Sequence, residues 1–422
     1  MPKYLIVGGS AGGIGAVEAI REVDPVGTIT LISEEPFPQY SRPMIADFLS
    51  KEASLEKMKY RDDYFWEKNG VQALTGRKAV RLNVADRYME LDGGDKINFE
   101  KLLIATGGKP FVPKIEGVDA NGVLTFTTFS DAERLTTKID AGKKTVVIGG
   151  GLIGVSVAEA LAKRGLEVTI VELKDRILNL ILDESASKIA ENAIRKAGVT
   201  IITGQTVQRI LRKEDNSVAG VVLTNGKEAP CDLVVIAIGV VPRTDLVVGT
   251  EVKTNRGIVV DEFMGTSVPD VYACGDAAET YDFIFGENRL LPLWPVAHLG
   301  GRTAGYNMAG KKASYLEGTA MSALKYFDLP IISVGKVNMK EADGYEVLVN
   351  HDLAKNLYKK IVLKDNVIVG MLFVNGVERA GTIFFLMKNH VNVKKFKRQL
   401  ISENFGLAAL PLTVRKKLFM GV

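Results

Sequence analysis

Short apolar runs alternate with glycine-rich turns along most of this chain. Two runs stand out because each reads as a β-strand and is followed by clustered glycines: residues 3–7 are KYLIV and residues 145–148 are TVVI. A helical pattern follows each turn. The pattern therefore predicts two strand–turn–helix units, one at the N-terminus and one in the middle of the chain.

The segments that follow extend both units. The expected strands of the first unit are 28–32, 71–74 and 102–104. The expected elements of the second unit, which begins near residue 115, are a helix at 153–162, a strand at 168–172, a helix at 184–197 and a strand at 233–238. Residues 257–261 and 271–276 look like strands of the first unit resumed. We therefore predict that the second unit is inserted into the first.

The C-terminal part has a different order of predicted elements. Strands are expected at 358–363 and 367–374, and helical segments follow them. These segments carry the basic residues Lys394, Lys395, Lys397, Arg398, Arg415, Lys416 and Lys417. The basic tract either docks an acidic partner or forms a solvated helix face. The predicted domains are 1–114 with 243–315, then 115–242, and a third of another kind at 316–422.

The two glycine turns carry the first chemical signal. Residues 8–13 (GGSAGG) and 149–154 (GGGLIG) approximate GxGxxG between a strand and a helix. Glycine lets the backbone approach a pyrophosphate, whose charge then lies on free N–H groups at the start of the helix. In each unit a later strand ends at or near an acid, Glu34 or Glu172, about 20 residues after the last glycine, where it can accept bonds from a ribose.

One such turn is weak evidence, since small residues also occur wherever a helix packs closely on a strand. Two turns with paired acids are stronger, and they suggest that one cofactor passes electrons to another. Ser10 replaces the middle glycine of the first turn, and its small side chain must fit beside the phosphate. We therefore predict an α/β fold with two Rossmann-like dinucleotide-binding domains, one inserted in the other, and a C-terminal α+β domain.

Composition agrees with this picture and narrows it. The 422 residues fit about two to three domains, and the 42 glycines exceed the usual share of about 7%. Basic and acidic residues nearly balance, 54 against 50, for a formal charge of +4, so no nucleic-acid binding is expected. No apolar run reaches the length of about 20 residues that spans a bilayer, so no membrane association is expected.

Cysteine usage excludes several chemistries. Only Cys231 and Cys274 occur, without a CxxC pattern, so neither a disulfide framework nor a four-thiolate iron–sulfur cluster can form within this chain, and we expect no metal site. The apolar N-terminal run resembles a signal peptide, but its glycine turn suits a first β-strand better. We expect a soluble cytoplasmic protein.

Several motifs in a fixed order resemble a known family. After the first turn and Glu34 come YSRP at 40–43, ATGG at 105–108 before Pro110, the second turn, AIGVVP at 237–242 and CGDAAE at 274–279. This order resembles the FAD-dependent pyridine nucleotide-disulfide oxidoreductases, and most of all the branch of rubredoxin reductase, the NADH-binding part of assimilatory nitrite reductase and related NADH oxidases. The resemblance covers essentially the whole chain.

The resemblance implies that the first domain binds FAD and the second NAD(H). The FAD site would comprise Gly8, Ser10, Ala11, Gly12 and Gly13 at the pyrophosphate, Glu34 at the adenosine ribose, Arg42, Pro43, Val80, Ala105, Thr106 and Gly107 as further lining, Gly275 and Asp276 at the ribitol chain, and Pro295 and Ala297 at the flavin ring. The NAD site would comprise Gly149, Gly151, Leu152, Ile153, Gly154, Glu172 and Gly239.

A structural role is an alternative for four residues in or next to the expected FAD site. Arg42 could be a surface charge and Asp276 a helix cap, although the surrounding motifs favour cofactor contacts for both. His298, beside the flavin-facing segment, is interpreted as structural, since a lone histidine without partners usually is. Cys274 is interpreted as a small apolar filler on a buried strand.

Two departures from the family pattern matter. Relatives that reduce disulfides carry cysteines early in the FAD domain, whereas residues 41–48 contain none, so dithiol chemistry is not expected. Where the family often has a glutamate two residues after the last glycine of the second turn, this chain has Ser156, which leaves the hydride-transfer geometry open. The carboxylate of Glu172 favours NADH over NADPH, although the nearby Lys174 and Arg176 weaken that inference.

The function implied is electron transfer without a catalytic acid or base, because the flavin performs the chemistry. Hydride would pass directly between nicotinamide and flavin, and electrons would pass singly to or from an iron–sulfur protein on another chain. The resemblance also implies that this chain could be the NAD-coupling flavoprotein subunit of a larger complex, of the aldehyde oxidoreductase or phenylglyoxylate dehydrogenase type. The direction of electron flow and a homo-oligomeric state stay open.

Two alternatives also remain. One is a free-standing NADH oxidase that uses oxygen or a diffusible carrier. The other is a non-catalytic FAD-binding protein of regulation or assembly.

Overall fold

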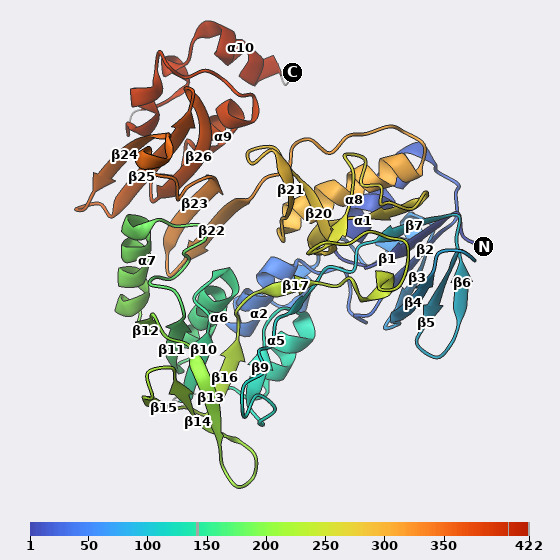
Figure 1. The fold of residues 1–422 in the computed structure, drawn as a ribbon, viewed down its shortest axis with the longest axis horizontal. Helices are drawn as coiled ribbons and strands as arrows, with labels where there is room; N and C mark the ends of the chain where they lie inside the picture. The colour runs from blue at the N-terminus through green and yellow to red at the C-terminus, as the bar shows by residue number, and fades with distance from the viewer. Residues whose placement is uncertain (141–142, 404, 421–422) are drawn as a thin grey trace. The chain divides into compact units, whose positions relative to one another are not determined.

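The computed structural model describes residues 1–140, 143–403 and 405–420. The chain divides into two compact units (Figure 1). The first consists of Met1–Phe111, Thr127–Phe129 and Val240–Thr319, and the second of Val112–Phe126, Ser130–Gly239 and Ala320–Val422. The three predicted domain boundaries stay a prediction.

The first unit contains a parallel five-stranded sheet. Its strands, in spatial order, are β19 (Val271–Ala273), β7 (Lys101–Ile104), β1 (Tyr4–Val7), β2 (Ile29–Ser33) and β3 (Val71–Thr75). The order follows the doubly wound rule, with β1 central and the sheet growing outward in both directions. Because β19 pairs with β7, the chain returns to this sheet after the second glycine unit, as predicted.

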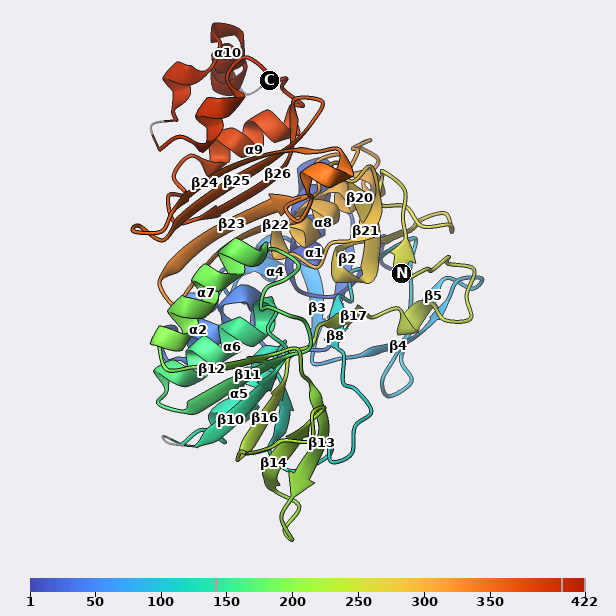
Figure 2. The same cartoon turned by 60° about the vertical axis from the view of Figure 1, so that its left-hand side comes forward.

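Two helices cover this sheet and pack on each other, α1 (Ala11–Val23) and α8 (Trp294–Met308) (Figures 1 and 2). Their contact is close because it is built from glycines: a Cβ on Gly301 would lie 2.0 Å from the oxygen of Gly12, and one on Gly305 would lie 2.5 Å from that of Ala16. The remaining helices of the unit are short, namely α2 (Ile45–Leu49), α3 (Leu55–Met58), α4 (Phe65–Lys68), and the 3-10 turns η1 (Arg42–Met44), η2 (Asp245–Val247) and η3 (Gly275–Ala277).

Three small sheets complete the first unit. They are β4 (Ala79–Asn83), β5 (Tyr88–Leu91) and β6 (Lys96–Asn98); β8 (Gly108–Pro110) with β17 (Val240–Pro242); and β18 (Ile258–Val259), β20 (Ala278–Asp282) and β21 (Glu287–Leu290). The expected strand at 257–261 is therefore shorter and belongs to the sheet of β20, not to the main sheet. The expected strand at 271–276 ends at Ala273, because the positive φ of Gly275 starts a 3-10 turn.

The second unit begins with another parallel sheet of the same kind. Its strands, in spatial order, are β12 (Thr200–Thr203), β11 (Glu167–Glu172), β10 (Lys144–Ile148), β16 (Leu233–Ile236) and β9 (Val123–Thr125). The helices of this part are α5 (Phe129–Thr136), whose first residue falls in the first unit, α6 (Leu152–Lys163) and α7 (Glu184–Lys196). An antiparallel sheet of β13 (Val207–Arg212), β14 (Val218–Leu223) and β15 (Glu228–Pro230) packs its apolar face into the same core.

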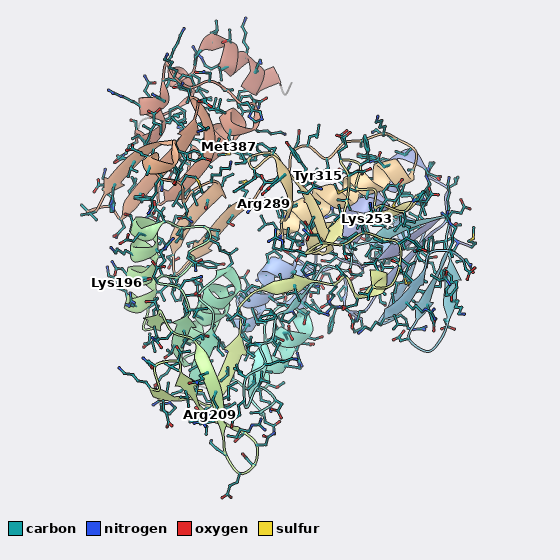
Figure 3. All side chains as sticks on the ribbon, viewed as in Figure 1. Lys196, Arg209, Lys253, Arg289, Tyr315 and Met387 are labelled. Atoms are coloured by element: carbon teal, nitrogen blue, oxygen red, sulfur yellow. The ribbon has the colours of Figure 1, made fainter. Side chains whose placement is uncertain are left out.

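The C-terminal part adds an antiparallel five-stranded sheet. Its strands, in spatial order, are β22 (Met321–Tyr326), β23 (Leu329–Gly335), β26 (Val367–Val374), β25 (Leu357–Lys364) and β24 (Glu346–Asp352). Its helices are α9 (Ala380–Lys388), α10 (Leu412–Met420), and the 3-10 turns η4 (Glu341–Asp343), η5 (Lys397–Ile401) and η6 (Leu407–Ala409). Helix α9 packs against β26, and its Met387 is fully buried (Figures 2 and 3).

The α/β architecture with two Rossmann-like sheets and a C-terminal α+β part is thus confirmed. The helical segment expected around Lys397 is the 3-10 helix η5. Among the described residues, no helix has both the length and the apolar character needed to cross a bilayer.

Candidate functional site: two nucleotide cradles

The first glycine turn has no room for side chains where it meets the sheet. A Cβ on Gly8, which has a φ of 120°, would lie 2.1 Å from the oxygen of Ala105, and one on Gly13 would lie 2.0 Å from the oxygen of Gly8. Helix α1 begins directly afterwards, and Ser10 is its N-cap without a side-chain capping bond. The free N–H groups of the first helical turn therefore face the space above the sheet, as a bound pyrophosphate requires.

Gly12 is the point where several predicted site residues meet. A Cβ on Gly12 would lie 2.8 Å from the sulfur of Cys274 and 3.4 Å from both the Cβ of Ala105 and the oxygen of Ala297. Gly275 is close by, since a Cβ there would lie 3.2 Å from that of Ala297. The structure thus brings together residues from the start of α1, the ends of β7 and β19, and the start of α8 at one edge of the first sheet.

The segment after β7 is tied to the residue that follows β17. The hydroxyl of Thr106 donates to the carbonyl of Arg243 at 2.8 Å, and the N–H of Arg243 donates to the carbonyl of Gly107 at 2.9 Å. These two bonds hold the side chain of Arg243 near the same edge. Arg243 was not among the predicted site residues, although it directly follows the motif that ends at Pro242.

Glu34 follows β2 and lies between two cations. Its carboxylate accepts from Arg243 and lies 3.4 Å from the ammonium of Lys78. Partial burial raises the pKa of Glu34, but Arg243 and Lys78 outweigh that effect and hold the pKa below its ordinary value. The side chain stays 45% exposed, so an ionised acceptor remains reachable for a ribose.

Arg42 is held by a carboxylate that the sequence did not single out. Its guanidinium pairs with Glu35 at 2.5 Å and donates to the carbonyl of Thr127 at 2.7 Å. The hydroxyl of Tyr40 donates to the same Glu35 at 2.9 Å and accepts from the N–H of Phe129 at 3.0 Å. Arg42 is therefore a fixed charge rather than a free surface side chain, while its contact with FAD stays a prediction.

Asp276 lies in the 3-10 turn after β19 and keeps its acceptor capacity. Cys274, not Asp276, is the N-cap of that turn, so the helix-cap interpretation does not hold. Burial raises the pKa of Asp276, and attraction by Arg42 offsets part of that rise. Among the described residues no side chain donates a hydrogen bond to this carboxylate, which leaves it available to a ligand hydroxyl.

The start of α8 presents Trp294 and Pro295 next to a polar network. The ring of Trp294 meets Tyr60 edge-on at 4.3 Å, and its indole N–H is buried without a partner among the described residues. One turn later, the Nε2 of His298 lies 3.2 Å from Glu18, which also pairs with Arg61. Burial lowers the pKa of His298. These contacts favour the structural interpretation of His298.

Two further predicted residues lie on β4 and η1. Val80 is 47% exposed on β4, at the point where its ladder with β5 is irregular between Ala79 and Arg81. Pro43 lies in η1 beside Arg42. Their roles in FAD binding stay predictions.

The second glycine turn repeats the geometry of the first. A Cβ on Gly149, which has a φ of 105°, would lie 2.5 Å from the oxygen of Ala237, and one on Gly154 would lie 1.9 Å from the oxygen of Gly149. Helix α6 begins at Leu152 and is preceded by the N-cap Gly151, so its first turn also offers free N–H groups. Gly239, with a φ of 121°, has no atom within 4 Å of an added Cβ, which leaves open space beyond β16.

Glu172 is an integral part of this second turn. Its carboxylate is buried and accepts from the N–H of Gly150 at 2.6 Å and from the N–H of Lys174 at 2.8 Å. Arg176 pairs with its neighbour Asp175 at 3.0 Å. A glutamate at the end of β11 favours a free ribose 2′-hydroxyl over a 2′-phosphate.

We therefore expect NADH to be preferred over NADPH by about tenfold or more in kcat/KM, because a hydrogen bond to a charged group contributes about 1.5–3 kcal/mol. Steady-state kinetics with both nucleotides and one artificial acceptor measure this ratio. Equal efficiency with the two nucleotides would contradict the role of Glu172.

Two glycine cradles, each at the edge of a parallel sheet and each with an acid after a later strand, define a Rossmann-type oxidoreductase that binds two nucleotides. Residues 2–301 match the family described as pyridine nucleotide-disulphide oxidoreductase, and residues 321–391 match the rubredoxin NAD+ reductase C-terminal domain. The chain belongs to the pyridine nucleotide-disulphide oxidoreductase family, and it is an FAD-dependent NAD(H) oxidoreductase. The predicted resemblance and cofactors are thereby confirmed.

Individual relatives agree with this assignment. The chain is 33% identical over 406 residues to the NADH-dependent phenylglyoxylate dehydrogenase subunit epsilon of Aromatoleum evansii, covering 95% of this chain and 94% of that subunit. It is 28% identical over 395 residues to a nitrite reductase [NAD(P)H] of Bacillus subtilis (strain 168), covering 93% of this chain but only 48% of that protein. The crystal structure of the NADH:rubredoxin oxidoreductase from Clostridium acetobutylicum superposes with a TM-score of 0.77 at 26% identity, covering 97% of this chain and 98% of the other.

Proposed function

We propose that this protein uses FAD to pass electrons between NAD(H) and an iron–sulfur electron-transfer partner on another chain, as the NAD-coupling subunit of a larger oxidoreductase. Two similar proteins support this: one is named as a subunit of an NADH-dependent dehydrogenase, and the other as an NADH:rubredoxin oxidoreductase. We place the protein in the cytoplasm, in line with two unpaired cysteines.

The observation that carries the proposal is the state of the two thiols. Cys231 and Cys274 are the only cysteines, and both are buried and unpaired. Burial, with a smaller effect of a neighbouring aspartate, raises the pKa of each thiol to about 12. A free thiol is already reduced and cannot accept electrons, and a buried thiol that stays protonated at neutral pH is poorly suited to form the disulfide that could. Electrons must therefore leave to an acceptor outside this chain.

The other residues of the two cradles bind and orient the nucleotides. The free N–H groups after Gly8 and Gly149 receive the two pyrophosphates, and Glu34 and Glu172 accept from the riboses. Asp276 accepts from a hydroxyl of the ribitol chain. Bound FAD would supply the ring that takes a hydride and releases electrons one at a time. No side chain is assigned to proton transfer.

The proposal is tested by isolating the protein under native conditions and identifying the chains that copurify in fixed ratio by mass spectrometry. We expect at least one iron–sulfur or metal-cofactor protein. A solitary oligomer would instead point to a diffusible carrier or to oxygen. The variant Cys231→Ala should transfer electrons at the wild-type rate, because the proposed route does not pass through a thiol; Cys274 is left in place because its sulfur packs against Gly12 in the first cradle.

Kinetics separate the two alternatives. Fast NADH consumption in air with no added carrier would favour a free-standing oxidase. Bound FAD that NADH reduces only slowly, measured anaerobically by stopped-flow absorbance, would favour a non-catalytic role in regulation or assembly.

A further inference from the structure

The loop between β11 and α7, residues 173–183, forms one wall of the second nucleotide cradle. It starts at Glu172, whose carboxylate accepts from Gly150, and the N–H of Leu178 donates to the carbonyl of Gly150 at 2.8 Å. Both hydrogen-bonding groups of Gly150 are thus satisfied by this wall. The conformation of the loop and that of the glycine turn therefore depend on each other.

One residue of this loop has a strained backbone. Leu178 has a φ of 52°, a left-handed conformation that is unfavourable for a residue with a Cβ. Ile177, Leu178 and Leu182 are buried, whereas Leu173 and Leu180 expose 60% and 87% of their surface. A strained backbone persists only where its surroundings hold it in place.

The C-terminal sheet provides this restraint. On β23, the hydroxyl of Ser333 donates to the carbonyl of Ile181 at 2.6 Å, and just after β23 the amide of Asn338 donates to the carbonyl of Asn179 at 2.9 Å. β22 lies against α6, and the hydroxyl of its Tyr326 donates to the carbonyl of Leu152 at 3.0 Å. Figures 1 and 2 both show β22 and β23 beside this part of the second unit.

The end of the loop is held more strongly, at Asp183. One carboxylate oxygen of Asp183 accepts from the N–H of Ala186 and so caps α7, which ends at Lys196 (Figure 3). The other oxygen accepts from the hydroxyl of Tyr358 at 2.6 Å and from the ammonium of Lys360 at 3.0 Å. Tyr358 and Lys360 share one face of β25 because they are two residues apart. Burial and the bond to Asp183 raise the pKa of Tyr358, so it remains a hydrogen-bond donor.

We propose that the C-terminal sheet is a functional part of the NAD site: Ser333, Asn338, Tyr358 and Lys360 are positioning residues that hold the loop 173–183 in its nucleotide-binding conformation. This inference rests on the proposed role of the second cradle as the NAD site. Fixing the loop before binding removes an entropic cost from the binding step, so it raises the affinity for NAD(H) without any contact between these four residues and the nucleotide.

The test compares a variant that loses hydrogen bonds to the loop 173–183 with a control variant that loses a similar hydrogen bond elsewhere in the C-terminal part. The variant Ser333→Ala/Asn338→Ala removes two tethers from the loop. Asn350→Ala is the matched control, because the amide of Asn350 also donates to a loop carbonyl, that of Ile401, at the same 2.9 Å, but far along the chain from residues 173–183. Isothermal titration with NAD+ gives Kd, and hydrogen–deuterium exchange without nucleotide reports the opening of the loop.

We expect the double variant to raise Kd for NAD+ about tenfold, equivalent to about 1.4 kcal/mol, and to speed exchange in peptides covering 173–183, with bound FAD unchanged. The control should change neither quantity. Equal Kd and equal exchange in the double variant and the control would overturn the inference. A wild-type protein that binds no NAD+ would overturn the proposed function and the inference together. If the double variant loses its FAD or its cooperative unfolding, the single variant Asn338→Ala is judged by the same criteria.

Discussion

Replacing Gly154 by alanine is expected to slow the reduction of bound FAD by NADH by at least about 100-fold, since misplacing reacting groups by about 1 Å costs on that order. The added Cβ would lie 1.9 Å from the carbonyl oxygen of Gly149, which is backbone and cannot rotate away. The turn must therefore open, and the N–H groups at the start of α6 move from the pyrophosphate. Anaerobic stopped-flow absorbance measures the rate.

The matched control is Gly381→Ala. Gly381 lies in α9, where an added Cβ meets no atom within 4 Å, so alanine should be neutral or slightly stabilising. Both variants should retain stoichiometric FAD, because the residues of the first cradle belong to the other unit. A Gly154→Ala protein that NADH reduces at the wild-type rate would show that this turn does not bind the nucleotide.

Much of the architecture follows from patterns that act over short stretches. The strands at the two glycine turns and the helices after them lie where the apolar runs predict them, with ends shifted by a residue or two. Strand 367–374 was predicted with its observed bounds. These elements are predictable because the spacing of apolar residues along a short stretch of sequence shows which face of a strand or helix is buried.

What the sequence did not show depends on residues far apart in the chain. The small antiparallel sheets, such as β4 to β6, are short and half exposed, and the sheet to which β18 belongs is decided by pairing with β20. In the same way, the ion pair of Glu34 with Arg243 joins residues that are 209 positions apart in the sequence. A motif reveals that Glu34 follows a strand, but no local pattern reveals which cation faces it.

The two acids placed after strands illustrate this limit further. Both were predicted as ribose acceptors from spacing alone, yet Glu172 is buried and bonded to its own glycine turn, whereas Glu34 is half exposed between two cations. The same motif therefore appears in two electrostatic settings. Only the folded structure shows that Glu172 also stabilises its glycine turn, whereas Glu34 does not.

The second large effect is expected at Gly13, where alanine should abolish FAD binding and destabilise the first unit by about 3 kcal/mol or more, as overpacking against immobile atoms does. The added Cβ would lie 2.0 Å from the carbonyl oxygen of Gly8, at the centre of the first cradle. FAD content, from the absorbance of the released flavin, and thermal unfolding monitored by circular dichroism measure the two effects.

Gly9→Ala provides the comparison in the same turn. Its Cβ would lie 3.0 Å from the hydroxyl and 3.1 Å from the Cβ of Ser33, contacts that a shift of a few tenths of an ångström relieves, so this variant should keep most of its FAD. Because α1 packs on α8 through Gly12 and Gly15, displacing the start of α1 also disturbs the segment around Ala297. A Gly13→Ala protein with full FAD occupancy and unchanged thermal stability would mean that the turn relaxes without cost, and the first cradle would not be the FAD site.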